Sequence, residues 1–408
     1  MTGREFFATR TVAEALGGFS PTLRTATETV PLATALHRVP AADITSPGPL
    51  PGFARSTVDG YAVRAADTYG ASEGLPSYLD VTGTVLMGTE PDVTVAAGAA
   101  AEMPTGGVLP PGADAVVMVE HTAETMPGTV EVLRPVAPGA GTVRADEDVA
   151  PGAVLAPAGR PLRAPDLGML AAAGVTEVVV HARPRVALVA TGDEVVAPST
   201  EALRPGQVRD AITAALAGLV LDAGGEPMPC GIVPDDPAAL DSTLRAALGQ
   251  ADLVVVSAGS SVGARDATAE VVGGLGEPGV FCHGVALKPG KPTLLAECDG
   301  VPVIGLPGNP LSALVVFRLL GVPLVWRLAG CPTPPPEPSI TAVLSRNVPS
   351  EAGRFDVVQV RLADGQAQPL FGASALLSVL TRADGYLVVP EPATGLDEGA
   401  EVEVKLYG

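Results

Sequence analysis

Three carboxylates stand where an apolar run of the sequence gives way to a loop. Glu194 ends a Thr-Gly-Asp-Glu segment, Asp235 follows a second apolar run, and Asp266 lies just beyond a loop of small residues. If they meet at one sheet edge, each pair at about 4 Å repels by roughly 4 kcal/mol at an effective dielectric near 20. Such a cluster requires a cation, and hard oxygen ligands suit Mg²⁺. We therefore expect Glu194, Asp235 and Asp266 to bind magnesium, although a plain acidic turn explains the first segment equally well.

The loop before Asp266 has the composition of a phosphate-binding loop. Residues 257–263 read Ser-Ala-Gly-Ser-Ser-Val-Gly and offer consecutive backbone N–H groups and hydroxyls beside an expected helix start. The expected ligand contacts are Ser257, Gly259, Ser261 and Gly263. The run also matches the G-x-S-x-G elbow of serine hydrolases. We reject that interpretation because His283 is the only later histidine, and the few acids before it are too close in sequence to occupy separate strand ends.

Two of the three lysines in the chain, Lys288 and Lys291, share one Lys-Pro-Gly-Lys-Pro loop. In a chain of formal net charge −20 this pairing indicates a local anion site, although two solvated surface lysines are an open alternative. The loop is not a Walker A motif, because proline follows Lys291 where Ser or Thr should bind magnesium. A second rigid loop adds four candidate ligand-binding residues, Pro307, Gly308, Asn309 and Pro310. Prolines preset the backbone of both loops, and glycines allow a ligand to approach closely.

The overall composition excludes several classes of protein. With 45 acidic against 25 basic side chains, the chain has too few cations to favour nucleic acid, whose binding depends on neutralising phosphates. The four cysteines have no C-x-x-C spacing and the four histidines are scattered, which gives no zinc signature. The longest apolar stretches, such as 311–328, are interrupted by arginines, a glycine and a proline, and we see no basic-then-apolar leader. We expect a cytoplasmic enzyme with no membrane partner.

The elements that must position these loops follow a β-α-β pattern after Pro184. Near-continuous valine and leucine runs indicate strands buried on both faces, hence a parallel sheet. In such a sheet ligands bind beyond the carboxyl ends of the strands, where the loops above are found. The expected strands are Val186–Ala190, Pro227–Val233, Leu253–Ser257 and Val301–Ile304. The expected helices are Ala211–Ala223, Pro237–Leu248 and Leu311–Leu320.

The rest of the chain divides at proline-rich and glycine-rich stretches. Helices are expected at Thr11–Leu23, Leu32–Val39 and Ala164–Ala173. Short alternating runs such as Tyr78–Val85 and Phe355–Leu362 indicate β-rich units before and after the α/β unit. The predicted class is α/β multidomain. Its four units are a helical and extended N-terminal unit (1–48 plus 141–182), an inserted β-rich unit (49–140), a parallel α/β unit (183–330) and a C-terminal β unit (331–408).

Taken together and in this order, the motifs resemble the MoeA family of molybdopterin molybdenumtransferases, which also includes the E domain of gephyrin. The most specific of them are the lysine loop and the segment Gly305-Leu306-Pro307-Gly308-Asn309-Pro310, at the right spacing. Others are Ser56-Thr57-Val58-Asp59-Gly60-Tyr61, Pro104-Thr105-Gly106 and Thr191-Gly192-Asp193-Glu194. The resemblance covers nearly the whole chain. It implies that the α/β unit is a MogA/MoaB-like molybdopterin-binding domain.

The resemblance implies an activity as well as a fold. The family inserts molybdenum from molybdate into adenylylated molybdopterin and releases AMP with the help of a divalent cation. By motif position the catalytic residues would be Asp59, Thr105, Glu194, Asp235 and Asp266. Asp59 and Thr105 would reach the site from the other subunit of a homodimer, although Asp-Gly dipeptides such as Asp59-Gly60 are also common in plain turns. The family also implies contact with the molybdopterin adenylyltransferase and with molybdoenzymes.

Several positions depart from the family pattern. Ala211-Ile212 stands where Ser-Asn is usual, Ala258 and Ser260 replace Gly and Val, Ala54 replaces Asp, and Gln359 stands where Arg is frequent. No basic residue follows Asp266. These changes leave two alternatives open, since fold does not settle function. One is a catalytically weakened paralogue that carries molybdopterin, and the other is a structural organiser.

Overall fold

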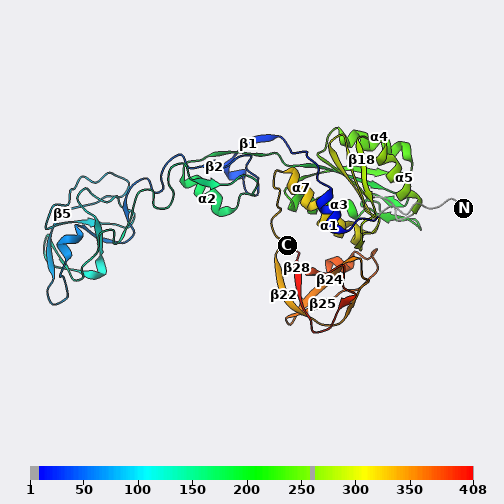
Figure 1. The fold of residues 1–408 in the computed structure, drawn as a ribbon. Coiled ribbons are helices and arrows are strands. Elements are labelled where there is room, and N and C mark those ends of the chain that lie inside the picture. Colours follow the sequence, from blue (N-terminus) through cyan, green and yellow to red (C-terminus); the bar gives the residue numbers. More distant parts are fainter. Residues whose placement is uncertain (1–8, 258–261, 408) are drawn as a thin grey trace.

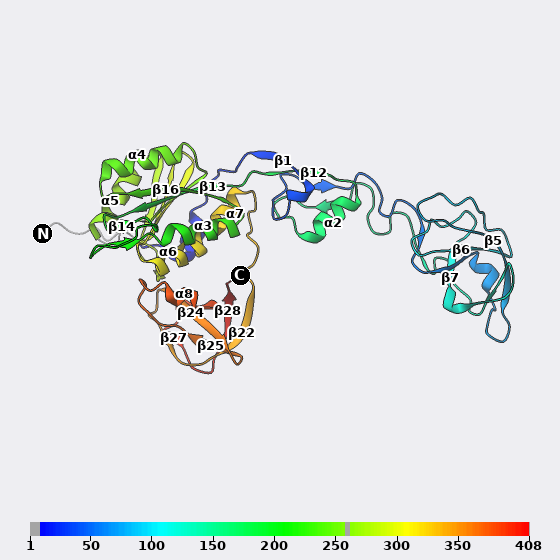
Figure 2. The same cartoon turned by 180° about the vertical axis from the view of Figure 1, so that it is seen from behind.

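The computed structural model describes residues 9–257 and 262–407, and for residues 262–266 it describes the backbone alone. The molecule is elongated (Figures 1 and 2). The α/β unit and the C-terminal β unit lie together at one end, and the inserted β-rich unit lies at the other. A narrow part of the chain connects the two ends. The candidate residues are therefore distributed over two distant regions.

The narrow connection is an antiparallel ribbon of β1 (Thr27–Pro31) and β12 (Glu177–His181). Helix α2 (Ala164–Ala172) buries Leu170 in one core with Val30 of β1 and Val178 of β12, and it confirms the predicted helix. The predicted helix over Leu32–Val39 is wrong, because only a 3₁₀ turn forms at Leu32–Thr34. Its continuation is broken by His37, whose φ of 63° is left-handed. Small two-stranded pairings of β2 (Ile44–Thr45) with β11 (Val154–Ala156) and of β3 (Arg55–Ser56) with β10 (Thr142–Val143) extend this region.

The inserted unit is one six-stranded sheet of order β7-β4-β6-β5-β9-β8. Its strand β4, next to the edge strand β7, begins at Gly60, where a Cβ would lie 1.8 Å from the Val117 carbonyl oxygen, so only glycine allows the neighbouring strand to come so close. The sheet buries Val63, Leu79 and Val130 on one face. Its strands are β4 (Gly60–Val63), β5 (Ser77–Thr84), β6 (Ala99–Met103), β7 (Ala115–Met118), β8 (Thr122–Met126) and β9 (Thr129–Val132).

The α/β unit contains a six-stranded sheet of order β16-β13-β17-β21-β20-β18. The first four strands are parallel, as predicted, but the last two pair antiparallel and form an edge that the sequence prediction missed. The strands are β13 (Arg185–Thr191), β16 (Glu226–Val233), β17 (Leu253–Ser257), β18 (Pro278–His283), β20 (Leu294–Cys298) and β21 (Val301–Leu306). The loop after β13 also forms the small parallel pair β14 (Val195–Val196) and β15 (Val208–Arg209).

Helices cover both faces of this sheet, which explains its continuous apolar strands. Along β13, Val186 and Leu188 face one core, and Ala187 and Val189 face the other. One face is covered by α4 (Pro237–Leu248) and α5 (Val262–Gly273), and the other by α3 (Ile212–Asp222) and the helices that follow β21. Helix α4 starts as predicted, since the Asp236 carboxylate accepts a hydrogen bond from the Ala239 N–H at 2.8 Å.

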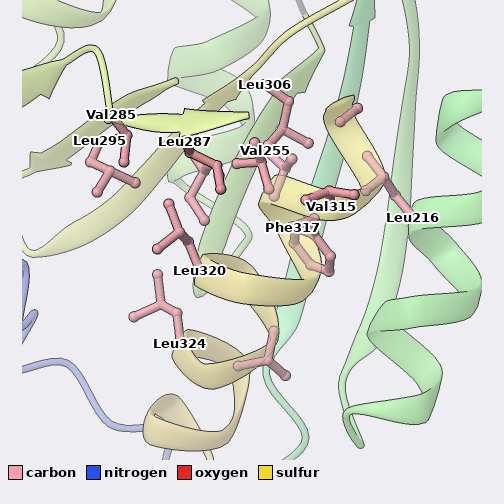
Figure 3. Packing of buried hydrophobic residues seen from close by; sticks show 14 of the residues in the cluster. Leu216, Val255, Val285, Leu287, Leu295, Leu306, Val315, Phe317, Leu320 and Leu324 are labelled. Atoms are coloured by element: carbon pink, nitrogen blue, oxygen red, sulfur yellow. The ribbon is translucent and has the colours of Figure 1, made fainter. Parts of the chain in front are cut away.

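The largest core lies under α3 and the long helical stretch after β21 (Figure 3). That stretch is longer than predicted and runs through α6 (Pro310–Val316), a π segment (Phe317–Gly321) and α7 (Val322–Leu328). Phe317 is fully buried in this core, and Gly321 leaves room for its ring. Residues Pro310–Leu328 are long and apolar enough to cross a membrane, but 61% of their apolar stretch is buried inside the structure, as expected of a core helix.

Two contacts tie other parts of the chain to the α/β unit. Helix α1 (Val12–Gly18) packs Val12 and Ala15 into the same core, although the sequence prediction placed it in the N-terminal unit. The C-terminal sheet has the order β19-β24-β25-β22-β28-β26, and β19 (Leu287–Lys288) belongs to the lysine loop. The lysine loop is therefore hydrogen-bonded into a second sheet. The other strands are β22 (Ser339–Leu344), β24 (Phe355–Ala363), β25 (Gln366–Pro369), β26 (Gly385–Val389) and β28 (Glu401–Leu406), with α8 (Ser378–Thr381) between them.

Candidate functional site

A pocket of about 420 Å³ lies at the carboxyl ends of β13 and β17, where the parallel sheet predicts a ligand site. Glu194 lines it from the loop that follows β13, and Ser257 lines it from the last position of β17. A third wall comes from the loop after β21, and a fourth from the C-terminal unit near α8. The lining residues include Thr191, Glu194, Asp210, Ser257, Gly308, Asn309, Pro310 and Leu377. Four of the predicted ligand-binding residues, Ser257, Gly308, Asn309 and Pro310, thus share one pocket with Glu194.

Three neighbouring carboxylates beside this pocket, those of Asp193, Glu194 and Asp235, affect the pKa of Asp235. The Asp193 carboxylate accepts a hydrogen bond from the Asp235 N–H at 3.1 Å, which holds the two loops together. Burial, followed by the negative charges of Asp193 and Glu194, raises the pKa of Asp235 above its usual value. Three negative charges are therefore crowded at the edge of β13 and β16, and a bound cation would relieve their repulsion.

The donor set suits a magnesium ion only in part. Among the described residues, no group of three His, Cys, Asp or Glu side chains is arranged to hold a metal ion. Glu194 and Asp235 supply carboxylates, and Mg²⁺ is commonly bound by one or two carboxylates together with substrate phosphates. The backbone of Asp266 lies in α5, but its side chain falls outside the description, as do Gly259 and Ser261 entirely. Gly263 is described as backbone in the same helix.

Two of the positions that depart from the family pattern line this pocket at the start of α3. Ala211 and Ile212 both line it, so the substitution of two usually polar residues changes the surface that a ligand would meet. Asp210 remains and accepts a hydrogen bond from the Thr213 N–H at 3.0 Å, which fixes the start of α3. The side chains of Ala211 and Ile212 themselves can offer a ligand no hydrogen bonds.

A second pocket, of about 540 Å³, lies between the lysine loop and the C-terminal sheet. Lys288 and Lys291 line it, as does the predicted Pro307. The Lys288 ammonium lies 3.4 Å from the Asp356 carboxylate of β24, and the Lys288 side chain is 55% exposed. Lys291 is also exposed. The two lysines therefore face a cavity rather than solvent alone, as an anion site requires.

Asn309 joins the two pockets because it lines both. Its side-chain amide donates a hydrogen bond to the Ser374 hydroxyl at 3.0 Å, and the Leu311 N–H donates to the Ser374 carbonyl at 3.1 Å. The C-terminal unit is thus fastened to the start of α6 at the boundary between the pockets. Sequence reasoning missed Ser374, Arg354 and Asp356 in these walls. The only available signal was the position of Gln359, which lies in the same strand as Asp356.

Gln359 stands where the family often has arginine, and it lines the lysine pocket. The side chain is buried, its Oε1 accepts a hydrogen bond from the Tyr407 hydroxyl, and its Nε2 has no hydrogen-bond partner in the described structure. Burial raises the pKa of Tyr407 to about 12, so this hydroxyl stays protonated and donates. Gln359 therefore offers a neutral N–H donor where the family often places a positive charge.

Asp59 and Thr105 lie in the inserted β-rich unit, far from both pockets within one chain (Figures 1 and 2). The Asp59 carboxylate accepts a hydrogen bond from the Thr105 N–H at 2.8 Å, and both residues are exposed. Thr105 also lines a hollow of about 900 Å³ between the β-rich unit and α2. The structure brings these two residues together, but it does not bring them to Glu194.

Family models and known proteins match this architecture along the chain. Residues 10–174 match the MoeA N-terminal region (domain I and II), residues 187–327 match a probable molybdopterin binding domain, and residues 341–407 match the MoeA C-terminal region (domain IV). A protein of this class combines a molybdopterin-binding α/β domain with an inserted arm and a C-terminal sheet. The chain belongs to the MoeA family, which confirms the resemblance recognised from its motifs and the α/β multidomain fold class.

Individual relatives align with this chain along nearly their full length. Molybdopterin molybdenumtransferase 2 of Mycobacterium tuberculosis is 34% identical over 92% of this chain and 94% of its own. The molybdopterin molybdenumtransferase of Haemophilus influenzae is 32% identical over 94% of each chain. A molybdopterin biosynthesis MoeA protein of Pyrococcus horikoshii has a solved structure that covers 98% of this chain and all of its own, with a TM-score of 0.87 and 32% identity. A second such structure gives a TM-score of 0.82 at 38% identity, over 98% of this chain and 99% of its own. The chain is thus an enzyme with a role in molybdenum cofactor biosynthesis.

Proposed function

We propose that this protein inserts molybdenum from molybdate into adenylylated molybdopterin, giving molybdenum cofactor and releasing AMP. The proposal rests on one observation above all: Glu194, Ser257 and the Gly308-Asn309-Pro310 loop line one pocket, and Asn309 connects it to the pocket of Lys288 and Lys291. A ligand with a pterin end and an adenylate end requires two adjoining cavities with an anion site. Molybdenum would end on the dithiolene sulfurs of the ligand, so no cysteine of the protein is needed.

The residues of the protein would act mainly by position and charge. In this mechanism Lys288, Lys291 and the 257–263 loop bind the phosphates, and the proline-containing loops hold the substrate without losing much entropy. Glu194, Asp235 and Asp266 would hold a magnesium ion, which when bound neutralises phosphate charge during cleavage of the phosphoanhydride. The raised pKa of Asp235 is consistent with this role, because crowded carboxylates gain the most from a nearby cation.

We further propose that the working unit is a homodimer. Asp59 and Thr105 are exposed at the far end of the same chain, so they can join the site only from a second copy. Contact with the molybdopterin adenylyltransferase and with molybdoenzymes belongs to the same proposal. The cytoplasm remains the proposed location, since the long apolar helix Pro310–Leu328, the single such helix among the residues that the structure describes, is part of the core.

The direct test is reconstitution with purified protein, adenylylated molybdopterin, molybdate and Mg²⁺. We expect AMP release and cofactor formation in step, with neither in the absence of a divalent cation. Asp266→Asn should reduce turnover on the order of 100-fold while thermal unfolding is unchanged. A matched control is Asp222→Asn, at the exposed end of α3 and outside both pockets.

The reconstitution also separates the enzyme from the alternative of a molybdopterin carrier. Tight binding of adenylylated molybdopterin without AMP release would favour the carrier. That outcome would also explain Ala211 and Ile212 in the pocket wall, since a carrier has no need of their polar counterparts.

A further inference from the structure

One arginine of the long helical stretch contacts the C-terminal unit near both of its chain ends. Arg318 lies in the π segment Phe317–Gly321, and its NH1 group is 2.8 Å from the Glu337 carboxylate. Its guanidinium also lies over the Tyr407 ring, 4.6 Å from the ring centroid. Glu337 stands shortly before the first strand of the C-terminal sheet, and Tyr407 directly follows the last one. A single side chain therefore joins the α/β unit to both ends of the C-terminal unit.

The contacts of Arg318 continue into the core between the two units. The Tyr386 hydroxyl donates a hydrogen bond to the Glu337 carboxylate, and the centroid of the Tyr386 ring lies 5.8 Å from that of Tyr407. Burial, followed by the hydrogen bond to Glu337, raises the pKa of Tyr386, so its hydroxyl stays protonated and donates. Tyr386 is 3% exposed and packs in the same core as Phe317 of the helix. We call Arg318, Glu337, Tyr386 and Tyr407 the arginine cluster.

The π segment explains why Arg318 faces the C-terminal unit while its neighbours face the core. A π turn adds one residue to the helix, so its side chains point in directions that a regular α-helix would not give them. Within this segment Phe317 and Leu320 are buried, whereas the Arg318 side chain stays 22% exposed and reaches Glu337. The Phe317 ring fits because residue 321 is a glycine, where an added Cβ would lie 2.3 Å from that ring. Such π turns are frequent at functional sites.

An apolar hollow of about 380 Å³ lies beside the arginine cluster. Its lining comes from α3 and α6 of the α/β unit and from α8, Leu377 and Tyr407 of the C-terminal unit. Atoms that line a hollow lack packing partners, so the apolar contacts between the units are incomplete here. Leu377 also lines the pocket at the carboxyl ends of β13 and β17, together with Ala375. The position of this pocket wall therefore depends on the polar contacts at the edge of the hollow, where Arg318 lies.

We propose that Arg318 is a positioning residue for the pocket at the carboxyl ends of β13 and β17. Its ion pair and its contact with the Tyr407 ring hold the C-terminal unit in one orientation, and the segment 375–377 then stays in place as a wall of the pocket. The inference rests on the proposed function, because substrate binding reports on that wall. It assigns a role to a residue that lines neither of the two candidate pockets.

Steady-state kinetics separate positioning from a loss of stability. Arg318→Met keeps the length of the side chain but removes the ion pair and the cation. A displaced pocket wall weakens binding of the substrate and of its transition state alike. KM for adenylylated molybdopterin should therefore rise by about tenfold, while kcat stays close to that of the parent. A variant that is merely less stable loses active protein, which lowers the apparent kcat and leaves KM unchanged. Arg318→Lys keeps the ion pair and should restore KM in part.

Hydrogen exchange measured by mass spectrometry tests the orientation without reference to turnover. The Leu311 N–H donates to the Ser374 carbonyl across the contact between the units, so its exchange reports how often that contact opens. Exchange at Leu311 should be about tenfold faster in Arg318→Met, while strand β17 exchanges as in the parent. Arg346→Met is the matched control, because Arg346 lies over the Phe371 ring, 4.7 Å from its centroid, inside the C-terminal unit. It should leave exchange at Leu311 unchanged.

The outcomes separate this inference from the proposed function. If exchange at Leu311 in Arg318→Met matches the parent, or if it rises while KM stays unchanged, the inference is wrong and the proposed function stands. If the parent itself releases no AMP, the proposed reaction is wrong, and exchange at Leu311 alone decides the inference. If Arg318→Met does not fold, Glu337→Gln decides by the same criteria, because it removes the ion pair at a side chain that is 33% exposed.

Discussion

The two ends of the molecule carry candidate residues in very different settings. At the α/β end, loops from β13, β17 and β21 and a wall from the C-terminal sheet enclose two adjoining pockets. At the β-rich end, Asp59 and Thr105 share one local hydrogen bond on an exposed surface. The first region gathers its candidate residues around two adjoining pockets, whereas the second presents two exposed residues beside a hollow of about 900 Å³. The difference is consistent with the proposed homodimer, in which the β-rich end of one copy would reach the pockets of another.

Subunit complementation is the strongest test of whether Asp59 and Glu194 of one site come from different chains. Asp59→Asn and Glu194→Gln should each lower turnover on the order of 100-fold. If each site combines Asp59 of one chain with Glu194 of another, randomly mixed dimers of the two variants contain some intact sites. Co-expression should then restore about a quarter of the parent activity. Turnover is measured as AMP release, and dimer content by analytical ultracentrifugation.

Complementation fails if both residues of a site come from the same chain. In that case the mixture stays as inactive as its components, and the proposal that the β-rich end acts at the site of a second copy is wrong. Asp80→Asn is a suitable control, since Asp80 is exposed on β5 of the sheet whose strand β4 directly follows Asp59. It should neither reduce activity nor affect the mixture.

The narrow connection between the two ends, formed by β1, β12 and α2 and here called the arm, contains a buried ion cluster. The contribution of this cluster to stability gives the second prediction. Asp166 is 6% exposed and accepts bonds from Arg160 at 2.8 and 2.9 Å and from Arg163 at 3.1 Å. We expect Asp166→Asn to reduce the free energy of unfolding of the arm by about 2–3 kcal/mol. Pyrophosphate binding at the α/β end should be unchanged. Calorimetric unfolding, compared with the parent, checks the first point.

The pH dependence of this contribution has a definite sign. Hydrogen bonds from Arg160, followed by those from Arg163, hold the pKa of Asp166 well below its usual value. The stabilisation is therefore fully present above the ordinary Asp pKa and is lost as the pH falls toward the depressed one. Asp241→Asn, which breaks an exposed pair with Arg245, should cost less than about 0.5 kcal/mol. An equal loss in both variants would contradict the role of burial.

The α/β end was predictable from sequence to a greater extent than its neighbours, for physical reasons. Buried parallel strands such as Leu253–Ser257 are continuous apolar runs, and β17 has these bounds. The edge strand Pro278–His283 was missed because it mixes exposed and buried positions and so lacks the continuous apolar run of the buried parallel strands. The helix predicted at Leu32–Val39 failed because nothing in its apolar spacing reveals that His37 is left-handed. Local pattern cannot report such tertiary constraints.

The site residues, too, could be predicted only where local sequence pattern reveals them. Glu194, Ser257 and Asn309 could be found because a strand end followed by a loop is visible in the sequence. Asp356 and Ser374 could not, because their importance comes from contacts with residues about 70 positions away. Thr105 came only from the family resemblance, and its single hydrogen bond to Asp59 has no signature in local composition.

The pocket wall formed by Ala211 and Ile212 supplies the third prediction. Ala211→Ser/Ile212→Asn returns the residues that the family usually has at positions lining the pocket. One added hydrogen bond to the ligand is worth about 1 kcal/mol, so turnover or affinity should rise by up to about tenfold. A rise in turnover alone would show that these positions act on the reaction. No change in either quantity would show that the departures are neutral, and would remove the main argument for a carrier.

The smallest expected effect concerns the thiols and tests whether the two ends are independent. All four cysteines lie at position 230 or later, so none belongs to the β-rich end or to α2. Burial, helped by the nearby Asp299 charge, raises the pKa of Cys298 to about 11. At pH 9 only about one Cys298 in a hundred is then ionised, and the thiolate is the reactive form.

Alkylation of Cys298 by iodoacetamide in the folded protein should therefore be slow, and Asp166→Asn should leave its rate unchanged. The reason is that loosening the arm exposes no part of the core that surrounds β20, where Cys298 lies beside Val272 and Ala296. Mass spectrometry of digested samples at timed intervals measures the rate, with half-buried Cys230 as the internal reference. If Cys298 reacts faster in the Asp166→Asn protein, the two ends unfold together, and the arm cannot move or be exchanged between subunits without disturbing the pockets.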